Sequence, residues 1–148
     1  MAVDEHVIAA RLAALDQYLR LLGDFARLEL PAFAGDPRNY AAAERFLQLA
    51  IESVFDIGTH FIAALGLPRP NRYAEVLPAL ADAQVIRRET AVELTNLAGF
   101  RNLLVHDYMR IERERVHGFL QSRLDGFRHF ATDIAEYLHQ TGPNPKGA

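Results

Sequence analysis

The sequence has 148 residues, of which 50% are hydrophobic, and this fits one compact domain over residues 1–140 with a short flexible tail over residues 141–148. The absence of cysteine excludes disulfide bridges and Cys-ligated zinc or iron–sulfur sites, and it fits a reducing compartment. The formal net charge of −3 excludes a polycation that holds nucleic acid by bulk attraction, so any such binding must depend on local charge.

No apolar run approaches the roughly 20 residues that cross a bilayer, and the acidic start of the chain does not resemble a signal peptide. We therefore expect a cytoplasmic protein that has no membrane partner. All of the 16 basic residues except Lys146 are arginine, whose planar fork of donors matches phosphate oxygens better than lysine does. Codon bias in a GC-rich genome explains this preference equally well.

The first predicted helix runs from Asp4, its N-cap, to about Leu22. Its predicted core positions, spaced by about three or four residues, are Val7, Ala10, Leu15, Leu19 and Leu22. Prolines and a glycine predict a loop over residues 31–37. A second helix follows from the cap Asn39 to about Leu65, with the core stripe Phe46, Ala50, Val54, Ile57, Phe61 and Leu65.

A short third helix is predicted over residues 74–83, with Pro78 in its first turn or at a kink. A fourth helix is expected over residues 88–105 and a fifth over residues 111–139, where His117, His129 and His139 are interpreted as surface residues. No segment alternates with a period of two, so no sheet is indicated. The predicted fold is all-α: an antiparallel four-helix bundle with an additional short helix.

A polar cluster interrupts the apolar end of the fourth predicted helix, over Arg101–Tyr108. At about 100° per residue, Asn102 and His106 share one face, and Arg101 and Tyr108 share the neighbouring face. Arginine can hold phosphate oxygens with two bonds, and an imidazole can donate or accept a proton near neutral pH. These residues suit a reaction on a phosphodiester, although the spacing also fits a histidine and an arginine with only structural roles.

This segment resembles the HEPN superfamily, and in particular its HepT-like branch, whose motif is R-x-x-x-x-H-x-Y. Arg101, His106 and Tyr108 match its fixed positions. Gly99–Phe100, Leu104–Val105 and the segment from Ile51 to His60 also look like that branch. The resemblance covers about residues 4–140 and implies a single HepT-like helical domain.

The resemblance implies a ribonuclease that needs neither a metal nor another cofactor. Such domains form homodimers in which two motif helices line one cleft, and the 2′-hydroxyl of the RNA substrate attacks the adjacent phosphate. Arg101 would stabilise the developing charge, His106 would act as general base or acid, and Asn102 would orient the phosphate or the imidazole. Arg101 and His106 lie about 140° apart on one helix, which makes a contribution from a second subunit attractive.

Tyr108 has a different implied role, because the HepT-like branch is paired with a small nucleotidyltransferase antitoxin of the MntA-like kind. The antitoxin would adenylylate Tyr108, and the added bulk and negative charge would block RNA entry. The function that the resemblance implies is that of the toxin in a toxin–antitoxin system.

The resemblance suggests that Asp56 and His60, from the second predicted helix, help to position Arg101 or line the cleft, although simple exposed polarity explains them equally well. Asp107, from the motif, is expected to be a further supporting residue of the cleft. Glu52, Asp56 and His60 also form one stripe at i, i+4 and i+8, so a metal-dependent hydrolase is a further alternative. The arginines that follow the motif, Arg110, Arg113 and Arg115, either form ion pairs along a solvated helix or grip RNA phosphates.

A hypothesis from another class is a non-catalytic helical partner that binds nucleotide or scaffolds a nucleotidyltransferase. Such a protein would keep the fold without needing Arg101 and His106 together. Cleavage of RNA in EDTA separates the metal-independent enzyme from both alternatives.

Overall fold

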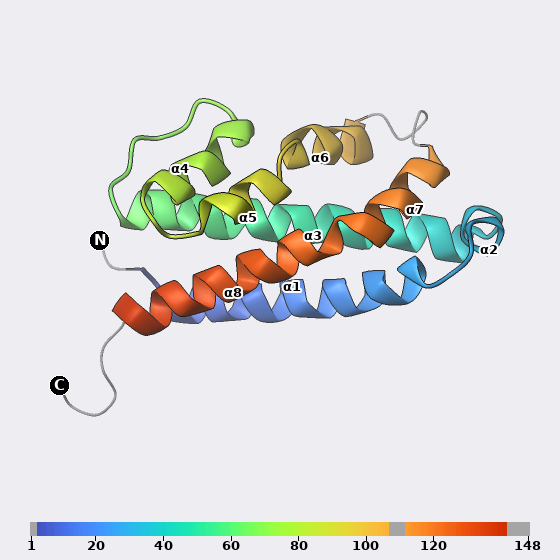
Figure 1. Cartoon of the computed structure of the whole chain (residues 1–148), viewed down its shortest axis with the longest axis horizontal. Coiled ribbons are helices and arrows are strands. Elements are labelled where there is room, and N and C mark those ends of the chain that lie inside the picture. Colours follow the sequence, from blue (N-terminus) through green and yellow to red (C-terminus); the bar gives the residue numbers. More distant parts are fainter. Residues whose placement is uncertain (1–2, 107–111, 142–148) are drawn as a thin grey trace.

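The computed structural model describes residues 3–106 and 112–141, and the regular elements in these ranges are helices (Figure 1). In chain order they are α1 (Glu5–Ala26), α2 (Leu30–Ala34), α3 (Pro37–Ala64), the 3-10 turn η1 (Tyr73–Glu75), α4 (Val76–Asp82), α5 (Arg88–Glu93), α6 (Leu97–His106), α7 (Arg113–Ser122) and α8 (Leu124–Thr141). The all-α prediction is confirmed. Of the predicted tail over residues 141–148, Thr141 is instead the last residue of α8, and residues 142–148 lie outside the described residues.

The bundle consists of four rods that alternate in direction, and two of the rods are made of two helices each (Figure 1). Helix α1 packs along α3, the α4–α6 segment packs on α3, and α7 and α8 pack on α1. The predicted antiparallel four-helix bundle is thus confirmed, with α4 as the additional short helix. The sequence analysis missed α2, which begins at Leu30 with Pro31 in its first turn.

Two aspartates cap the long helices α1 and α3. The carboxylate of Asp4 accepts hydrogen bonds from the backbone N–H groups of His6 and Val7, at 3.1 and 3.2 Å, as predicted. Helix α3 begins three residues earlier than predicted, because Asp36, not Asn39, is its N-cap and accepts from the backbone N–H of Arg38 at 2.9 Å. The hydrogen bonds from Arg38 also lower the pKa of the Asp36 carboxyl.

The predicted core stripe of α1 is wrong at its start. Ile8 is fully buried, whereas Val7 is 41% exposed and Ala10 is also exposed. Leu15, Leu19 and Leu22 are buried as expected. On α3, Ala50, Val54, Ile57 and Phe61 are buried, whereas Phe46 is half-buried and Leu65 is exposed. By length and composition α3 could cross a membrane, yet its apolar side chains pack in the bundle core, as in the central helix of a globular domain.

Two of the predicted helices are broken. The fourth becomes α5 and α6 because Asn96 adopts a left-handed backbone with φ of 67°, and the fifth becomes α7 and α8 at Arg123. The guanidinium of Arg123 donates to the carbonyls of Glu93 and Thr95, at 2.9 and 2.8 Å, so it caps the end of α5. The residue at the break between α7 and α8 therefore binds the backbone at the break between α5 and α6.

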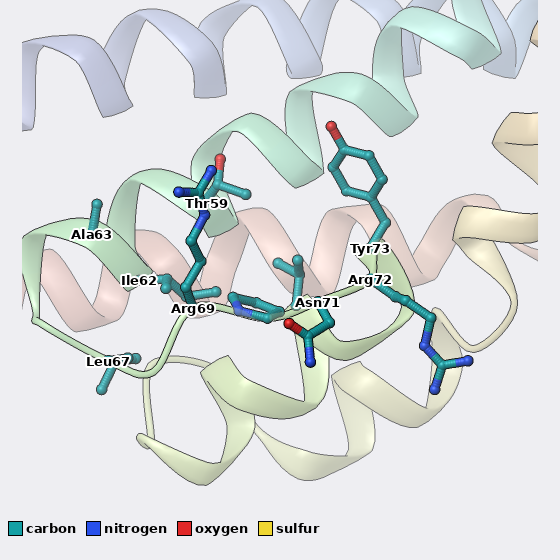
Figure 2. Close-up of a pocket in the computed structure, with 10 residues that line it drawn as sticks. Thr59, Ile62, Ala63, Leu67, Arg69, Asn71, Arg72 and Tyr73 are labelled. Carbon is teal, nitrogen blue, oxygen red and sulfur yellow. The ribbon is translucent and has the colours of Figure 1, made fainter.

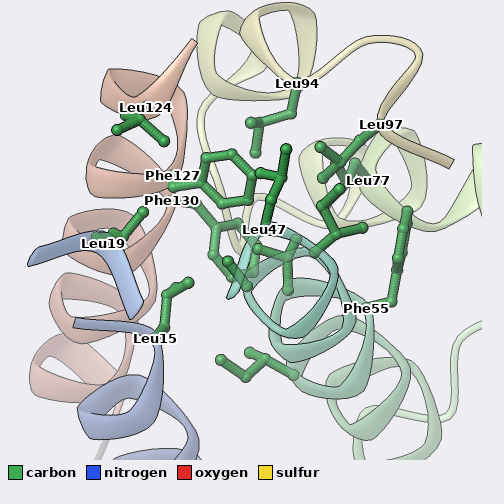
Figure 3. Close-up of a cluster of buried hydrophobic side chains, with 14 of the residues drawn as sticks. Leu15, Leu19, Leu47, Phe55, Leu77, Leu94, Leu97, Leu124, Phe127 and Phe130 are labelled. Carbon is green, nitrogen blue, oxygen red and sulfur yellow. The ribbon is translucent and has the colours of Figure 1, made fainter. Parts of the chain in front are cut away.

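Leucine and phenylalanine side chains from most of the helices fill the core (Figure 3). Phe127 and Phe130 of α8 meet Leu47 of α3 there, and burial of each such side chain contributes about 1.5–3 kcal/mol. Helix α4 approaches α3 closely at Gly58, where a Cβ atom would lie 2.6 Å from Cγ1 of Val76. Any larger residue there requires the Val76 side chain or α4 to shift.

Buried polar groups tie α7 and α8 to the rest of the bundle. The carboxylate of Asp133 is 4% exposed and accepts from the hydroxyl of Thr90 at 2.6 Å and from Nε of Arg87 at 2.9 Å. It also accepts from the backbone N–H of Arg87 at 3.1 Å, so it caps the start of α5. His117, interpreted from sequence as a surface residue, is buried, and its Nε2 lies 2.7 Å from the carbonyl oxygen of Leu28.

Candidate functional site

Helix α6 carries the motif arginine at the edge of the face that packs against α3. Leu97, Phe100 and Leu104 are spaced by three and four residues and are buried, which fixes the rotation of the helix about its axis. This rotation leaves the side chain of Arg101 25% exposed and Asn102 at the surface. The arginine predicted from sequence is therefore accessible to a ligand.

The guanidinium of Arg101 has three neighbours within the described structure. Its NH2 lies 3.8 Å from Oε1 of Glu52 on α3, and its NH1 donates to Oδ1 of Asn102 at 3.5 Å. Its Cζ lies 5.6 Å from the centre of the Tyr73 ring, within the range of a cation–π contact. The two polar contacts are long, so an incoming phosphate can exchange for them.

Glu52 is itself held in place, because its Oε1 accepts a hydrogen bond of 3.1 Å from Gln48 one turn earlier on α3. The carboxylate is 33% exposed and is the negative group nearest to Arg101 among the described residues. Glu52 can therefore orient the guanidinium and lower the local positive potential.

Asp56 and His60 make their contacts with α1 and not with Arg101. A carboxylate oxygen of Asp56 lies 3.7 Å from NH1 of Arg11, and Nε2 of His60 accepts a 3.1 Å hydrogen bond from the backbone N–H of Asp4. The expectation that these two side chains position Arg101 is corrected, because Glu52 makes that contact one turn earlier. Lining of the cleft by Asp56 and His60 stays a prediction.

The remaining motif residues are only partly described. His106 is the last residue of α6, and nothing further is described of its side chain. Asp107, Tyr108 and Arg110 lie outside the described residues. Their predicted roles stay predictions.

Two arginines near the start of α7 pack on aromatic rings of two different helices, α3 and α6. The Cζ of Arg113 lies 3.8 Å from the centre of the Tyr40 ring, and the Cζ of Arg115 lies 5.6 Å from that of Phe100. Burial raises the pKa of the nearby Glu44 carboxyl, and the positive charge of Arg113 opposes that rise. The guanidinium of Arg113 also donates to the carbonyl of Ala34 at 3.4 Å, so its described contacts lie with α2 and α3 and not with Arg101.

Glu52, Asp56 and His60 do not form a metal-binding group. Each makes contact with a different partner, and no cluster of three or more His, Asp or Glu side chains with metal-binding geometry occurs in residues 3–106 and 112–141. The sequence indicated Glu52 only as a candidate metal ligand and did not predict its contact with Arg101. Tyr73 was missed entirely, because a contact with a residue 28 positions away leaves no periodic signal.

The chain is similar in sequence to a known protein family. A family model described as Ribonuclease HepT-like matches residues 15–134, a range that contains all of the predicted site residues. The chain is 26% identical over 136 residues to the tRNA nuclease HepT of Aphanizomenon flos-aquae (strain 2012/KM1/D3), and the alignment covers 92% of each protein.

Two solved structures show the same fold. The cytosolic protein YutE of unknown function from Bacillus subtilis superposes with a TM-score of 0.83 at 22% identity, covering 96% of both chains. A tri-AMPylated HEPN toxin of Shewanella oneidensis, solved in complex with an MNT antitoxin, superposes with a TM-score of 0.79 at 22% identity, covering 88% of this chain and 97% of the toxin. The chain belongs to the HepT-like ribonuclease family.

Proposed function

We propose that this protein is the toxin of a toxin–antitoxin system and that it cleaves RNA without a metal ion. The observation that carries this proposal is the guanidinium of Arg101, which is 25% exposed and, among the described residues, makes only long polar contacts, on the same helix as His106. A half-buried arginine with exchangeable partners can accept a phosphodiester. Its position within the family match supports the same use.

The chemistry needs only groups of the protein and of the RNA. The 2′-oxygen of the substrate forms a bond to the adjacent phosphorus and loses its proton to a base. The bond from phosphorus to the 5′-oxygen breaks, and that oxygen takes a proton from an acid. The products are a 2′,3′-cyclic phosphate and a free 5′-hydroxyl. His106 serves as the base or the acid, Arg101 stabilises the additional negative charge, and Asn102 orients the phosphate.

A homodimer completes this site. Arg101 and His106 are five residues apart on one helix, which separates their directions by about 140°. A second copy of the motif that faces the first supplies a second histidine and a second arginine, so that an acid, a base and charge-stabilising groups can surround one phosphate. The exposed Asn102 and the half-buried Arg101 support a contact at this face of α6.

Cleavage of a labelled RNA in EDTA by the full-length protein and its variants tests the activity. Arg101→Ala and His106→Ala should each lower the cleavage rate by at least about 100-fold, the usual cost of losing a charge-stabilising or proton-transferring group. Arg20→Ala is the matched control, because Arg20 is an 80% exposed arginine on α1 whose ion pair is with Asp16, away from the motif. Undiminished cleavage by both motif variants, or complete loss in EDTA, would contradict the proposal.

We propose further that an MntA-like nucleotidyltransferase antitoxin neutralises the protein through Tyr108. The phenol oxygen attacks the α-phosphate of ATP, pyrophosphate leaves, and the new adenylate places negative charge beside the motif. Mass spectrometry after incubation with the antitoxin and ATP should find adenylate on the Tyr108 peptide and none on the peptide of Tyr73, which is 51% exposed. Full neutralisation of a Tyr108→Phe variant would contradict this mechanism.

A further inference from the structure

A cavity of about 490 Å³ lies between the end of α3, the segment 67–73 and the start of α4 (Figure 2). Its apolar wall consists of Ile62, Ala63, Leu67 and Val76. Its volume falls within the range of pockets that bind small organic groups. The polar residues that line it include two arginines and a tyrosine, and no carboxylate is among its lining residues.

Glu75 fixes the segment 67–73 at the edge of the cavity. Glu75 accepts a 3.0 Å hydrogen bond from the backbone N–H of Asn71, and its other oxygen lies 3.6 Å from NH2 of Arg72. Glu75 therefore occupies Arg72, whereas Arg69 has no ion-pair partner among the described residues. In Figure 2, Arg69 and Tyr73 rise on the same side of the loop, and Arg72 points away from them. Arg69 is thus the cation available to a ligand.

Tyr73 joins this cavity to the motif. Its ring lines the cavity, packs at 5.1 Å against the ring of Phe55, and receives the guanidinium of Arg101 at 5.6 Å. The side chain is nevertheless 51% exposed, although a large aromatic group usually hides most of its surface. A strand of nucleic acid whose phosphate is held at Arg101 therefore has the cavity directly beside it.

We propose that this cavity is a nucleotide subsite for single-stranded RNA next to the cleavage site. One base of the strand packs against Tyr73 and the apolar wall, and a neighbouring phosphate binds Arg69. An aromatic ring beside an arginine is the combination that holds unpaired bases with little sequence preference. The subsite rests on the proposed function, since it gives RNA as the occupant.

The chemistry of the cavity favours RNA over an acidic peptide. An acidic peptide would use Arg69 but would leave the apolar wall and the exposed ring uncovered. A nucleotide uses all three, because it combines a flat aromatic base with a negative phosphate. The overall net charge of −3 further means that affinity for RNA must come from local cations such as Arg69.

Fluorescence anisotropy with a labelled single-stranded 2′-O-methyl RNA measures binding without cleavage, because the attacking hydroxyl is blocked. Tyr73→Ala should weaken binding about tenfold, the usual effect of losing one stacked base. Arg69→Gln should weaken it several-fold and should lower the slope of log Kd against log salt by about 0.7, the value for one phosphate contact on a single strand.

Two variants keep the test informative. Tyr73→Phe retains the ring that packs on Phe55 and should bind like the wild type, which separates stacking from a loss of folding. Arg20→Gln removes an equal charge from the exposed surface of α1 and should leave both affinity and salt slope unchanged. Wild-type binding by both Tyr73→Ala and Arg69→Gln would overturn the proposal, as would an equal loss in Arg20→Gln.

Cleavage kinetics separate the subsite from the activity itself. Arg69→Gln, which does not touch Arg101, should raise KM for RNA and leave kcat within about twofold. If the wild type cleaves RNA and Arg69→Gln has the same KM, the proposed function stands and the proposed subsite is wrong. If the wild type binds the 2′-O-methyl RNA through Tyr73 and Arg69 but does not cleave RNA, the proposed subsite stands and the proposed function is wrong. Competition by free AMP or UMP at micromolar concentration would assign the cavity to a mononucleotide and overturn the proposal.

Discussion

Helices α5 and α6, which together form the third rod of the bundle, are held by opposite kinds of contact. The start of α5 is held by Asp133 of α8, which is 4% exposed and accepts three hydrogen bonds of 2.6 to 3.1 Å from Arg87 and Thr90. On α6, Arg101 is 25% exposed and meets Glu52 at 3.8 Å. Short, buried and fully satisfied contacts fix a backbone, whereas long and half-exposed ones leave donors for a ligand. One rod thus combines an anchor with a site.

The largest effect on stability is expected at the anchor. Asp133→Ala removes the cap of α5 and leaves the buried hydroxyl of Thr90 without its acceptor, so it should lower the free energy of unfolding by about 3 kcal/mol. Urea denaturation followed by circular dichroism measures this change.

Thr90→Val is the matched variant for that measurement. It removes one of the three donors, keeps the volume of the side chain and should cost only about 1 kcal/mol. A loss for Asp133→Ala no greater than that for Thr90→Val would show that the carboxylate does not anchor α5.

The opposite pattern is expected at the site. Glu52→Gln should change the free energy of unfolding by less than about 0.5 kcal/mol, because its ion pair with Arg101 is long and partly exposed. Removal of the carboxylate raises the local positive potential and frees the guanidinium to rotate. We therefore expect a KM for RNA that falls a few-fold together with a kcat that falls a few-fold.

Asp16→Asn controls for the loss of a negative charge, since Asp16 is an exposed carboxylate of α1 paired with Arg20 at 3.0 Å. It should leave both kinetic constants unchanged. A destabilisation of Glu52→Gln as large as that of Asp133→Ala would remove the contrast between anchor and site.

The smallest effect is expected at Glu44, two turns before Glu52 on α3. Burial raises the pKa of its carboxyl above 4.5, so the folded state binds the proton more tightly than the unfolded state does. The contribution of Glu44 to stability therefore falls as the pH rises from the unfolded pKa through the folded one. Glu44→Gln should stabilise the protein slightly at pH 7, by less than about 0.5 kcal/mol because water screens the half-exposed group.

Thermal unfolding of wild type and Glu44→Gln across the acidic range measures this difference. The two melting temperatures should converge below the unfolded pKa, where both side chains are neutral. A difference that grows on acidification would contradict the assigned direction.

Sequence patterns predicted the fold well where they depend on helical periodicity. Buried positions such as Leu15, Val54 and Phe127 recur at the expected spacing, because burial on one face of a helix leaves that repeat in the sequence. The breaks at Asn96 and Arg123 were missed for the converse reason. Neither involves a glycine or proline, and Arg123 caps α5 from a different rod, which no local pattern records.

The candidate site was predictable only in part. The motif itself identified Arg101, because its residue types and spacing match a known family. Its neighbours depend on how three segments meet: Glu52 and not Asp56 faces α6, and Tyr73 comes from the segment before α4. Such contacts are set by the rotation and approach of helices, and both depend on packing throughout the core.

The close approach at Gly58 has a consequence for how this protein can change. A Cβ there would lie 2.6 Å from the Val76 side chain, so a larger residue requires Val76 to give way, and a displacement of α4 would move Tyr73, three residues before Val76, relative to Arg101. We expect genetic selection for loss of toxicity to recover substitutions at Gly58 in chains that still fold. Toxicity would then be lost because the distance between α3 and α4 increases, while every residue of the motif is unchanged.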